Sequence, residues 1–328
     1  MLDCDIRLAL PDDVENIMKF IDHNWQKNHI LACDIDMFSW QYSFGSKLSM
    51  VLGIDSEGKI QGLLGYIAYE AEIGQKPDLC LALWKANTGQ GILGMRLLLF
   101  IKERVPHRHI FCVGINIKTT QRIYEDFGFS VGKMNQWYRL HIQDEYKIAS
   151  VCNLHIPTIS KKQLHIDYVS NPTDIKKYVK QSEDERPYKS LKYLEKRYFN
   201  HPKYKYELYL ANGGLDNSLL MVIRKQEAQN SCVLRLVDLV GDLSLFPYCT
   251  AAIDVLLQAN DAEYIDCYEL GVPRHYMLEA GYIPVEGSNN IIPNYFNPYL
   301  KENVSIYCAI DEEGFVIFRG DGDQDRPN

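Results

Sequence analysis

Two parts of the chain repeat one order of strand-like and helix-like segments, and this repeat constrains the fold more than any other feature. In the first part, the apolar run LCLALWKA (79–86) passes through a glycine-rich turn into the helix-like MRLLLFIKER (95–104). The strand-like HIFCVGI (109–115) and the helix-like TTQRIYEDF (119–127) follow. Alternating strands and helices of this kind predict an α/β fold with a mixed sheet.

The same order returns in the second half of the chain. The strand-like EYIDCYELG (263–271) corresponds to HIFCVGI, and RHYMLEAGY (274–282) corresponds to RIYEDFGF (122–129). Similarity at this scale indicates duplication of a whole domain, because solenoid repeats span only about 20–50 residues. Three strand-like runs and one helix-like run precede this pair: YELYLANGG (206–214), SLLMVIRKQ (218–226), SCVLRLVDLVGD (231–242) and YCTAAIDVLLQAN (248–260).

The repeat predicts two domains, residues 1–145 and residues 146–328. We expect each to be a mixed, mostly antiparallel sheet flanked by helices, an α/β (α+β) class. The boundary falls in a stretch rich in Lys, Ser, His and Pro, although IASVCNLHI (148–156) within it is strand-like. The C-terminal GDGDQDRPN (320–328) is polar, and we expect it to be extended with solvated charges.

Composition excludes several classes of protein. A chain of 328 residues that is 46% hydrophobic fits a globular protein, and no apolar run approaches the roughly 20 residues of a membrane span. The acidic start MLDCDIRLALPDDVENIMKF lacks the features of a secretory signal, so we expect a cytoplasmic protein. A net charge of -8 argues against nonspecific nucleic-acid binding. Composition leaves a homo-oligomer open.

The cysteine and histidine patterns argue against a metal site. The nine cysteines form no CxxC pair and most lie in apolar runs, which favours reduced, buried thiols over disulfides. The residues HRH (107–109) have no further ligands at metal-binding spacing. We therefore expect no bound metal.

The glycine-rich turn NTGQGILG (87–94) joins a strand to a helix. Glycines there let backbone N–H groups point at an anion beside the positive end of the helix, so the turn suits phosphate. A plain tight connection is an equally good interpretation of the glycines alone. A dinucleotide site of the Rossmann type is disfavoured, because the turn follows a late strand and no acid ends the next one. A P-loop is excluded, because no Gly-Lys-Ser/Thr follows.

Three segments together resemble the GCN5-related N-acetyltransferase superfamily: TGQGILGMRLL (88–98), HIFCVGIN (109–116) and NIKTTQRIYEDFGF (116–129). The resemblance covers about residues 4–140, with a fainter similarity over about 200–310. One departure concerns the superfamily's Gln/Arg-x-x-Gly-x-Gly/Ala pattern, which would fall on Thr88, Gly91 and Leu93. The first position here has no amide or basic group, and the last small residue is displaced to Gly94.

The resemblance implies an acyl-CoA donor, acetyl-CoA or another, with the pyrophosphate on the glycine turn and the pantetheine beside the strand 79–86. It also implies that Tyr124 lies near the thiol end, where a tyrosine hydroxyl can protonate the leaving thiolate. A half-buried core tyrosine is the alternative. The cofactor-binding residues implied are Leu83, Thr88, Gly89, Gln90, Gly91, Gly94 and Asn116.

The general base and the acceptor contacts are harder to predict. Glu70 and Glu72 lie on one face of the strand-like YIAYEAEI, where a carboxylate could take the ammonium proton through water, but such residues are equally often solvent-facing. Aromatic rings suit stacking on a sugar or base, and a cleft between the halves is a favoured place for a pocket. The acceptor contacts we expect are Trp40, Trp137, Arg197 and Tyr198.

The second domain is expected to be degenerate. Aligning Gly128-Phe129 with Gly281-Tyr282 places Met277 opposite Tyr124, and a Met cannot donate the proton. The second domain also has LVGDLSLFPYC (239–249) in place of the glycine turn. We therefore expect it to help bind the acceptor rather than CoA.

These observations lead to one preferred function and two alternatives. The preferred function is an N-acyltransferase acting on a small-molecule amine. Because GFSVGKMNQWYRL (128–140) is similar to segments of acyltransferases of surface-polysaccharide biosynthesis, a nucleotide-linked amino sugar is the preferred acceptor. One alternative is a Fem-type aminoacyl transferase acting on a peptidoglycan precursor, although neither a coiled-coil arm nor a basic face for tRNA is evident. The other is a noncatalytic ligand-binding protein with the same fold.

Overall fold

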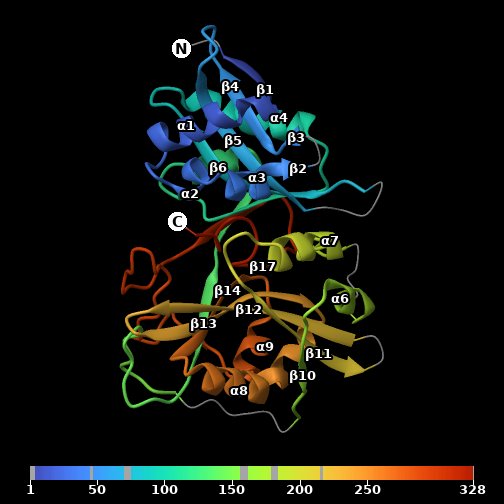
Figure 1. Ribbon diagram of the computed structural model, residues 1–328, viewed down its shortest axis with the longest axis vertical. Coiled ribbons are helices and arrows are strands. Elements are labelled where there is room, and N and C mark those ends of the chain that lie inside the picture. Colours follow the sequence, from blue (N-terminus) through green and yellow to red (C-terminus); the bar gives the residue numbers. More distant parts are fainter. Residues whose placement is uncertain are drawn as a thin grey trace.

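Two sheets, each with helices on its faces, lie one above the other along the longest axis of the molecule (Figure 1). The computed structural model describes residues 4–44, 47–69, 75–155, 162–178, 184–214 and 217–327. Figure 1 shows the N-terminal segments, from blue to teal, in the upper unit and the C-terminal segment, in red, running between the two units. The expected class, two mixed sheets flanked by helices, is confirmed.

Among the described residues, the first sheet has seven strands, of which only β6 and β7 pair in parallel. In spatial order they are β1 (Asp5–Leu8), β4 (Met50–Ile54), β5 (Ile60–Tyr69), β6 (Asp78–Ala86), β7 (Ile110–Val113), β16 (Tyr307–Ile310) and β8 (Ser130–Lys133). A two-stranded hairpin of β2 (Ser43–Phe44) and β3 (Lys47–Leu48) lies beside it.

Helices cover both faces of the first sheet. One core cluster joins the strands to α4 (Gly91–Arg104) and α5 (Gln121–Asp126). A second cluster joins them to α1 (Val14–Asn24), α2 (Ile30–Cys33) and α3 (Ile35–Tyr42), which follow the 3-10 turn Pro11–Asp13. Glycines let α4 approach the sheet closely, because a Cβ at Gly53 would lie 2.6 Å from the Leu93 side chain.

The second sheet repeats the plan, and its only parallel pair is β13 and β14. In spatial order its strands are β10 (Ile166–Tyr168), β11 (Glu207–Gly214), β12 (Asn217–Ala228), β13 (Ser231–Gly241), β14 (Tyr264–Leu270), β9 (Asn135–Leu140) and β15 (Ile283–Pro284), with β17 (Ile317–Phe318) also paired to β14. Helices α8 (Thr250–Asn260) and α9 (Arg274–Glu279) pack on one face. The other elements are α6 (Pro172–Tyr178), α7 (Leu191–Leu194), the π-helical turn Glu195–Phe199 and the 3-10 turn Leu243–Cys249.

The ends of α5 and α9 confirm the predicted alignment of the two halves. Both helices end at a glycine in the left-handed region, Gly128 (φ 84°) and Gly281 (φ 77°). In each case the next N–H reaches back to the helix at 3.0 Å, from Phe129 to the Tyr124 carbonyl and from Tyr282 to the Met277 carbonyl. Met277 is therefore the counterpart of Tyr124.

The two sheets exchange a strand. β9 follows β8 in the chain but belongs to the second sheet, while β16 comes from the C-terminal part and lies between β7 and β8 in the first sheet. The two crossing segments meet where the Met134 N–H donates to the Ile306 carbonyl at 2.9 Å. If the chain were divided at residue 145, β9 would be separated from the second sheet and β16 from the first.

The expectation that the C-terminal tail is solvated is wrong. Asp321 and Asp325 are 0% and 1% exposed. Asp325 is held by a bidentate ion pair with Arg224, at 2.8 and 3.0 Å, and Asp321 by Lys189 at 3.0 Å. Buried charges are stable only when paired in this way, and the partners lie far away in the sequence.

The strand expected over 148–156 is also absent from its described part, 148–155. One isolated bridge, Ser150 with Ile291, is formed there. The buried carboxylate of Glu263 accepts the N–H groups of Ile148 and Ala149 at 2.9 to 3.0 Å. These N–H groups therefore have no need of a neighbouring strand.

Candidate functional site

The parallel strands β6 and β7 diverge at the centre of the first sheet. They pair at Leu79 with Ile110, Cys80 with Phe111 and Leu81 with Cys112, and the pairing then stops although β6 continues to Ala86. Carboxyl ends of parallel strands that part in this way are common places for ligands in α/β proteins.

A bulge at Leu83 follows the point of divergence. The register with β5 shifts between Ala82 and Trp84, and Leu83 has a left-handed backbone at φ 60°. A non-glycine residue in this region is strained by about 1 kcal/mol, and bulges next to functional sites re-aim side chains. The Leu83 side chain packs with the α1 to α3 cluster, on the face opposite to Tyr124.

Two aromatic rings lie beside the diverging strands. Trp84 of β6 and Tyr124 of α5 meet edge to face with ring centroids 5.4 Å apart. Gly94 makes room for this arrangement, because its Cβ would already lie 3.4 Å from the Trp84 indole nitrogen. The sequence analysis missed Trp84, although a tryptophan at the carboxyl end of an apolar strand is a recognisable signal.

The Tyr124 hydroxyl is neutral and hydrogen-bonded to a sulfur atom. The ring is 2% exposed, and burial raises the pKa of Tyr124 well above its usual value. Its partner is the Cys112 thiol, and burial raises the pKa of Cys112 to about 12. The phenol is therefore protonated at neutral pH and lies beside the Cys112 sulfur, close to the place where β6 and β7 part.

The glycine turn leaves the start of α4 open. Gly89 has φ 81°, and a Cβ at Gly89 or Gly91 would meet no atom within 4 Å. Gln90 precedes the helix without a side-chain cap, and within the described chain the N–H groups of Gly91 and Ile92 have no hydrogen-bond partner. Unpaired N–H groups at the positive end of a 14-residue helix suit an anion.

The other predicted cofactor residues lie in the turn itself or before α5. Thr88 and Gly89 are exposed. Asn116 lies exposed before α5, where its side-chain oxygen accepts the Lys118 N–H at 3.0 Å and its carbonyl accepts the Thr120 hydroxyl at 2.9 Å. Glu70 and Glu72, the predicted bases, lie outside the described residues.

The corresponding place in the second sheet is closed. β13 and β14 also part, after Leu236 and Cys267, but β17 pairs with the end of β14 and the Gly320 N–H donates to the Val237 carbonyl at 2.8 Å. The start of α8 is closed too, because the Ala251 N–H donates to the Gln163 side chain at 2.8 Å.

The closing segment is held by a buried charge cluster. The Lys189 ammonium contacts Asp238 at 2.6 Å and Asp321 at 3.0 Å, and the Tyr198 hydroxyl donates to Asp238 at 2.6 Å. Asp321 also accepts the Tyr69 hydroxyl at 2.8 Å. Burial raises the pKa of Asp238 to about 6, and the charge of Asp321 acts in the same direction.

Three of the four predicted acceptor residues meet around this segment. The Trp40 indole N–H donates to the Lys196 carbonyl at 3.2 Å, and the Arg197 guanidinium lies 5.6 Å from the Trp40 ring. Arg197 also donates to the Gly320 carbonyl at 3.0 Å. Tyr198 is the third, through Asp238. Trp137 lies elsewhere: it is 1% exposed in the core of the second sheet, and its N–H donates to Glu269 at 2.8 Å.

A polar pocket of about 510 Å³ lies between the two halves. Gln26 of the first half contributes to it, and the Gln324 amide joins it to the end of β7 by donating to the Val113 carbonyl at 3.3 Å. The sequence analysis did not predict Arg224 and Arg235 as pocket residues. A charged residue inside an otherwise apolar strand is the feature that could have indicated them. The other lining residues include Tyr204, Gln226, Asn294, Tyr295, Phe296, Asn297, Asp323, Asp325 and Arg326.

Two further searches of the described residues bear on function. No group of three or more His, Cys, Asp or Glu side chains with metal-binding geometry is found in this part of the chain. None of the helices in it is long and apolar enough to cross a lipid bilayer.

Comparison with known proteins shows the fold. No family model and no curated protein matches the sequence. A GCN5-related N-acetyltransferase from Anabaena variabilis is similar with a TM-score of 0.54 and 13% identity, over 94% of this chain and 72% of that one. A conserved protein of unknown function from Enterococcus faecalis is similar with a TM-score of 0.55 and 7% identity, over 94% and 72%.

A third similar structure, from Pyrococcus horikoshii, has a TM-score of 0.50 and 12% identity over 96% of this chain and 94% of that one. These likenesses extend over nearly the whole chain, so they include residues of both sheets. The chain therefore has the fold of the GCN5-related N-acetyltransferases, built twice.

Proposed function

We propose that the protein is an N-acyltransferase whose first half binds an acyl-CoA. The observation that carries the proposal is the contrast at the two helix starts. The N–H groups that begin α4 are free beside open glycines, whereas the start of α8 is capped by Gln163. A pyrophosphate is the anion that free N–H groups at a strand-to-helix turn suit best.

The residues of the first half have distinct roles in this proposal. Gly89, Gly91 and Ile92 bind the pyrophosphate through backbone N–H groups. The acyl-CoA supplies an activated thioester, with its pantetheine beside β6. Tyr124 donates a proton to the leaving thiolate, and its raised pKa keeps the phenol protonated for this step. Glu70 and Glu72 stay the predicted bases for the ammonium of the acceptor.

The pocket between the halves is the proposed acceptor site. Its link to Val113 through Gln324 brings it to the end of β7, next to the divergence. Aromatic rings of Tyr204, Tyr295 and Phe296 offer stacking surfaces, and amide side chains offer hydrogen bonds to hydroxyl groups. A nucleotide-linked amino sugar of surface-glycan synthesis is the acceptor that we prefer, on the similarity of the segment 128–140.

Calorimetric titration with acetyl-CoA and free CoA tests the donor site. Gly91→Asp places a carboxylate where the pyrophosphate would lie, and it should weaken binding by about a hundredfold or more. Gly91→Asn is the matched control, because it has the same shape without the charge, and it should retain most of the affinity. No binding to the wild-type protein at millimolar CoA would refute the donor site.

A noncatalytic ligand-binding protein is the second candidate. The observation that favours it is the burial of Tyr124, whose hydroxyl already has the Cys112 thiol as partner. CoA binding without acyl transfer to any member of a panel of amino-sugar nucleotides, amino acids and peptides would favour this candidate. Transfer to one of them would exclude it.

A further inference from the structure

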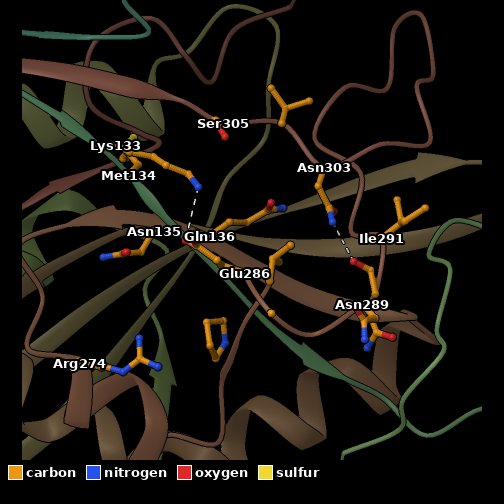
Figure 2. A pocket seen from close by; sticks show the side chains of 15 residues that line it. Lys133, Met134, Asn135, Gln136, Arg274, Glu286, Asn289, Ile291, Asn303 and Ser305 are labelled. Atoms are coloured by element: carbon orange, nitrogen blue, oxygen red, sulfur yellow. Dashed lines mark hydrogen bonds and ion pairs between the residues drawn. The ribbon is translucent and has the colours of Figure 1, made fainter.

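A second polar pocket lies where the two crossing segments exchange between the sheets (Figure 2). Its volume is about 520 Å³, within the range of about 300–1,000 Å³ that small-molecule sites occupy. Its walls come from 133–136, between β8 and β9, from 284–291, after β15, and from 303–305, before β16. It is separate from the pocket between the halves, with which it shares no lining residue.

Side-chain amides hold the walls of this pocket in place. Asn290 accepts the Cys152 N–H at 2.7 Å and donates to the Tyr138 hydroxyl at 2.7 Å. Asn303 accepts the Ile292 N–H and donates to the Asn290 carbonyl, both at 2.8 Å. The pocket is therefore formed before any ligand binds, which lowers the cost of binding.

Other polar groups in the pocket are not used by the protein. Within the described chain, no hydrogen bond or ion pair engages the side chains of Arg274, Asn289 or Ser305. The Arg274 guanidinium is positioned 5.2 Å from the Trp137 ring. Lys133 has only a long contact of 3.4 Å with Glu286, and both side chains are exposed. Two cations thus face one carboxylate.

The unused cations lie apart from the unused amide. In Figure 2, Lys133 and Arg274 lie on one side of the pocket, with Asn135 between them, while Asn289 lies on the other side. Arginine and lysine are the side chains that bind phosphate, and amide and hydroxyl groups bind sugar hydroxyls.

We propose that this pocket binds a sugar phosphate, with the phosphate on Arg274 and Lys133 and the hydroxyl groups toward Asn289. The site is independent of acyl transfer, because none of its residues belongs to the proposed donor or acceptor sites. Its walls come from both crossing segments, so the ligand holds the two exchanged connections together. Binding should therefore raise the melting temperature.

The test uses the full chain and glucose 6-phosphate as the probe, with glucose and inorganic phosphate as separate arms. We expect calorimetry to detect glucose 6-phosphate, and thermal melting to rise with its concentration. Each of the other two probes should bind at least about tenfold more weakly, since each lacks one set of contacts. Inorganic phosphate binding as tightly as glucose 6-phosphate would overturn the proposal.

Variants locate the site. Arg274→Gln and Lys133→Gln are exposed substitutions, and each should weaken glucose 6-phosphate binding by about tenfold or more. Arg122→Gln is the matched control, because Arg122 lies in the first turn of α5, the counterpart of α9, and is exposed outside the pocket. Equal affinity of wild type and Arg274→Gln, or no binding to the wild type at about 10 mM, would refute the site. Neither result depends on whether CoA binds.

Discussion

Each sheet has one pair of parallel strands that diverge, β6 from β7 in the first and β13 from β14 in the second. The first divergence is largely open, and the second is closed by the chain. Each follows three parallel pairs of residues, and each has a shift of register with the preceding strand, at Leu83 in the first and Val237 in the second. The first is bordered by the rings of Trp84 and Tyr124 and by a helix with free N–H groups. The second contains the chain's own segment 315–321.

The difference shows how one copy of a duplicated fold changes role. A diverging pair of parallel strands leaves backbone groups that must find partners. In the second sheet β17 and Gly320 provide them. In the first sheet the chain itself provides one contact, from Gln324 to the Val113 carbonyl, and the proposed donor would bind at the part that stays open. The second copy has thereby become part of the scaffold, and its C-terminal continuation reaches the end of β7 through Gln324.

Breaking the closure of the second sheet should have the largest effect. In Gly271→Ala, the new Cβ would lie 2.2 Å from the Phe315 carbonyl oxygen, at a backbone φ of 97°. Overpacking and backbone strain together should destabilise the protein by about 3 kcal/mol or more, measured by denaturant unfolding. Gly58→Ala is the control, since Gly58 has φ 81° with no atom within 4 Å of its Cβ. Equal losses in the two variants would mean that the closure contributes nothing.

Removing the phenol of the first sheet should reduce catalysis about a hundredfold. Tyr124→Phe keeps the ring packing and removes the proton donor, so kcat should fall by that factor while the Kd for acetyl-CoA stays the same. Met277→Leu changes the counterpart in the second sheet and should leave both constants unchanged. Unchanged turnover in Tyr124→Phe would exclude Tyr124 as the acid.

The buried charge cluster at the closed divergence predicts a pH dependence of stability. The pKa of Asp238 is raised to about 6, so its protonated form favours the folded state, and this contribution is complete below about pH 4 and lost as the pH rises through 6. Asp238→Asn should remove it. The free energy of unfolding of the variant relative to wild type should therefore rise by about 2 kcal/mol between pH 4 and pH 6.5. A constant difference would contradict the raised pKa.

Uncapping α8 should have the smallest effect and sharpens the contrast between the helix starts. Gln163→Ala removes the oxygen that accepts the Ala251 N–H at 2.8 Å and the Thr250 hydroxyl at 2.9 Å. Stability should fall by about 1 kcal/mol. CoA should bind with unchanged stoichiometry, because β17 still fills the divergence. A second CoA per chain would show that the cap alone closes the second half.

The sequence was sufficient to predict several central elements of each half and the alignment of α5 with α9. The match of Gly128-Phe129 with Gly281-Tyr282 depends on a local hydrogen-bond pattern, and local patterns are visible in sequence. The glycine turn and α4 were predicted for the same reason. Whether Tyr124 and the residues of the turn act on CoA stays a prediction.

The strand exchange and the buried tail could not be predicted from the sequence. The apolar and polar residues of β9 and β16 alternate in the same way whichever sheet the strands join. Such a pattern specifies which face of a strand is buried, but not which strand it pairs with. The tail GDGDQDRPN is polar, and its burial depends on Arg224 and Lys189, which are distant in sequence. Arg224 and Arg235 were not predicted as pocket residues, because the residues that complete the pocket are also distant in sequence.

The exchange of β9 and β16 sets the order in which the molecule can be completed during synthesis. The first sheet lacks the strand between β7 and β8 until every strand of the second sheet except β17 has been synthesised. Until then the edges of β7 and β8 are unpaired, and exposed edges promote association with other chains. Separate expression of the N-terminal part should therefore give an aggregating fragment, and adding a peptide with the sequence of β16 should rescue it.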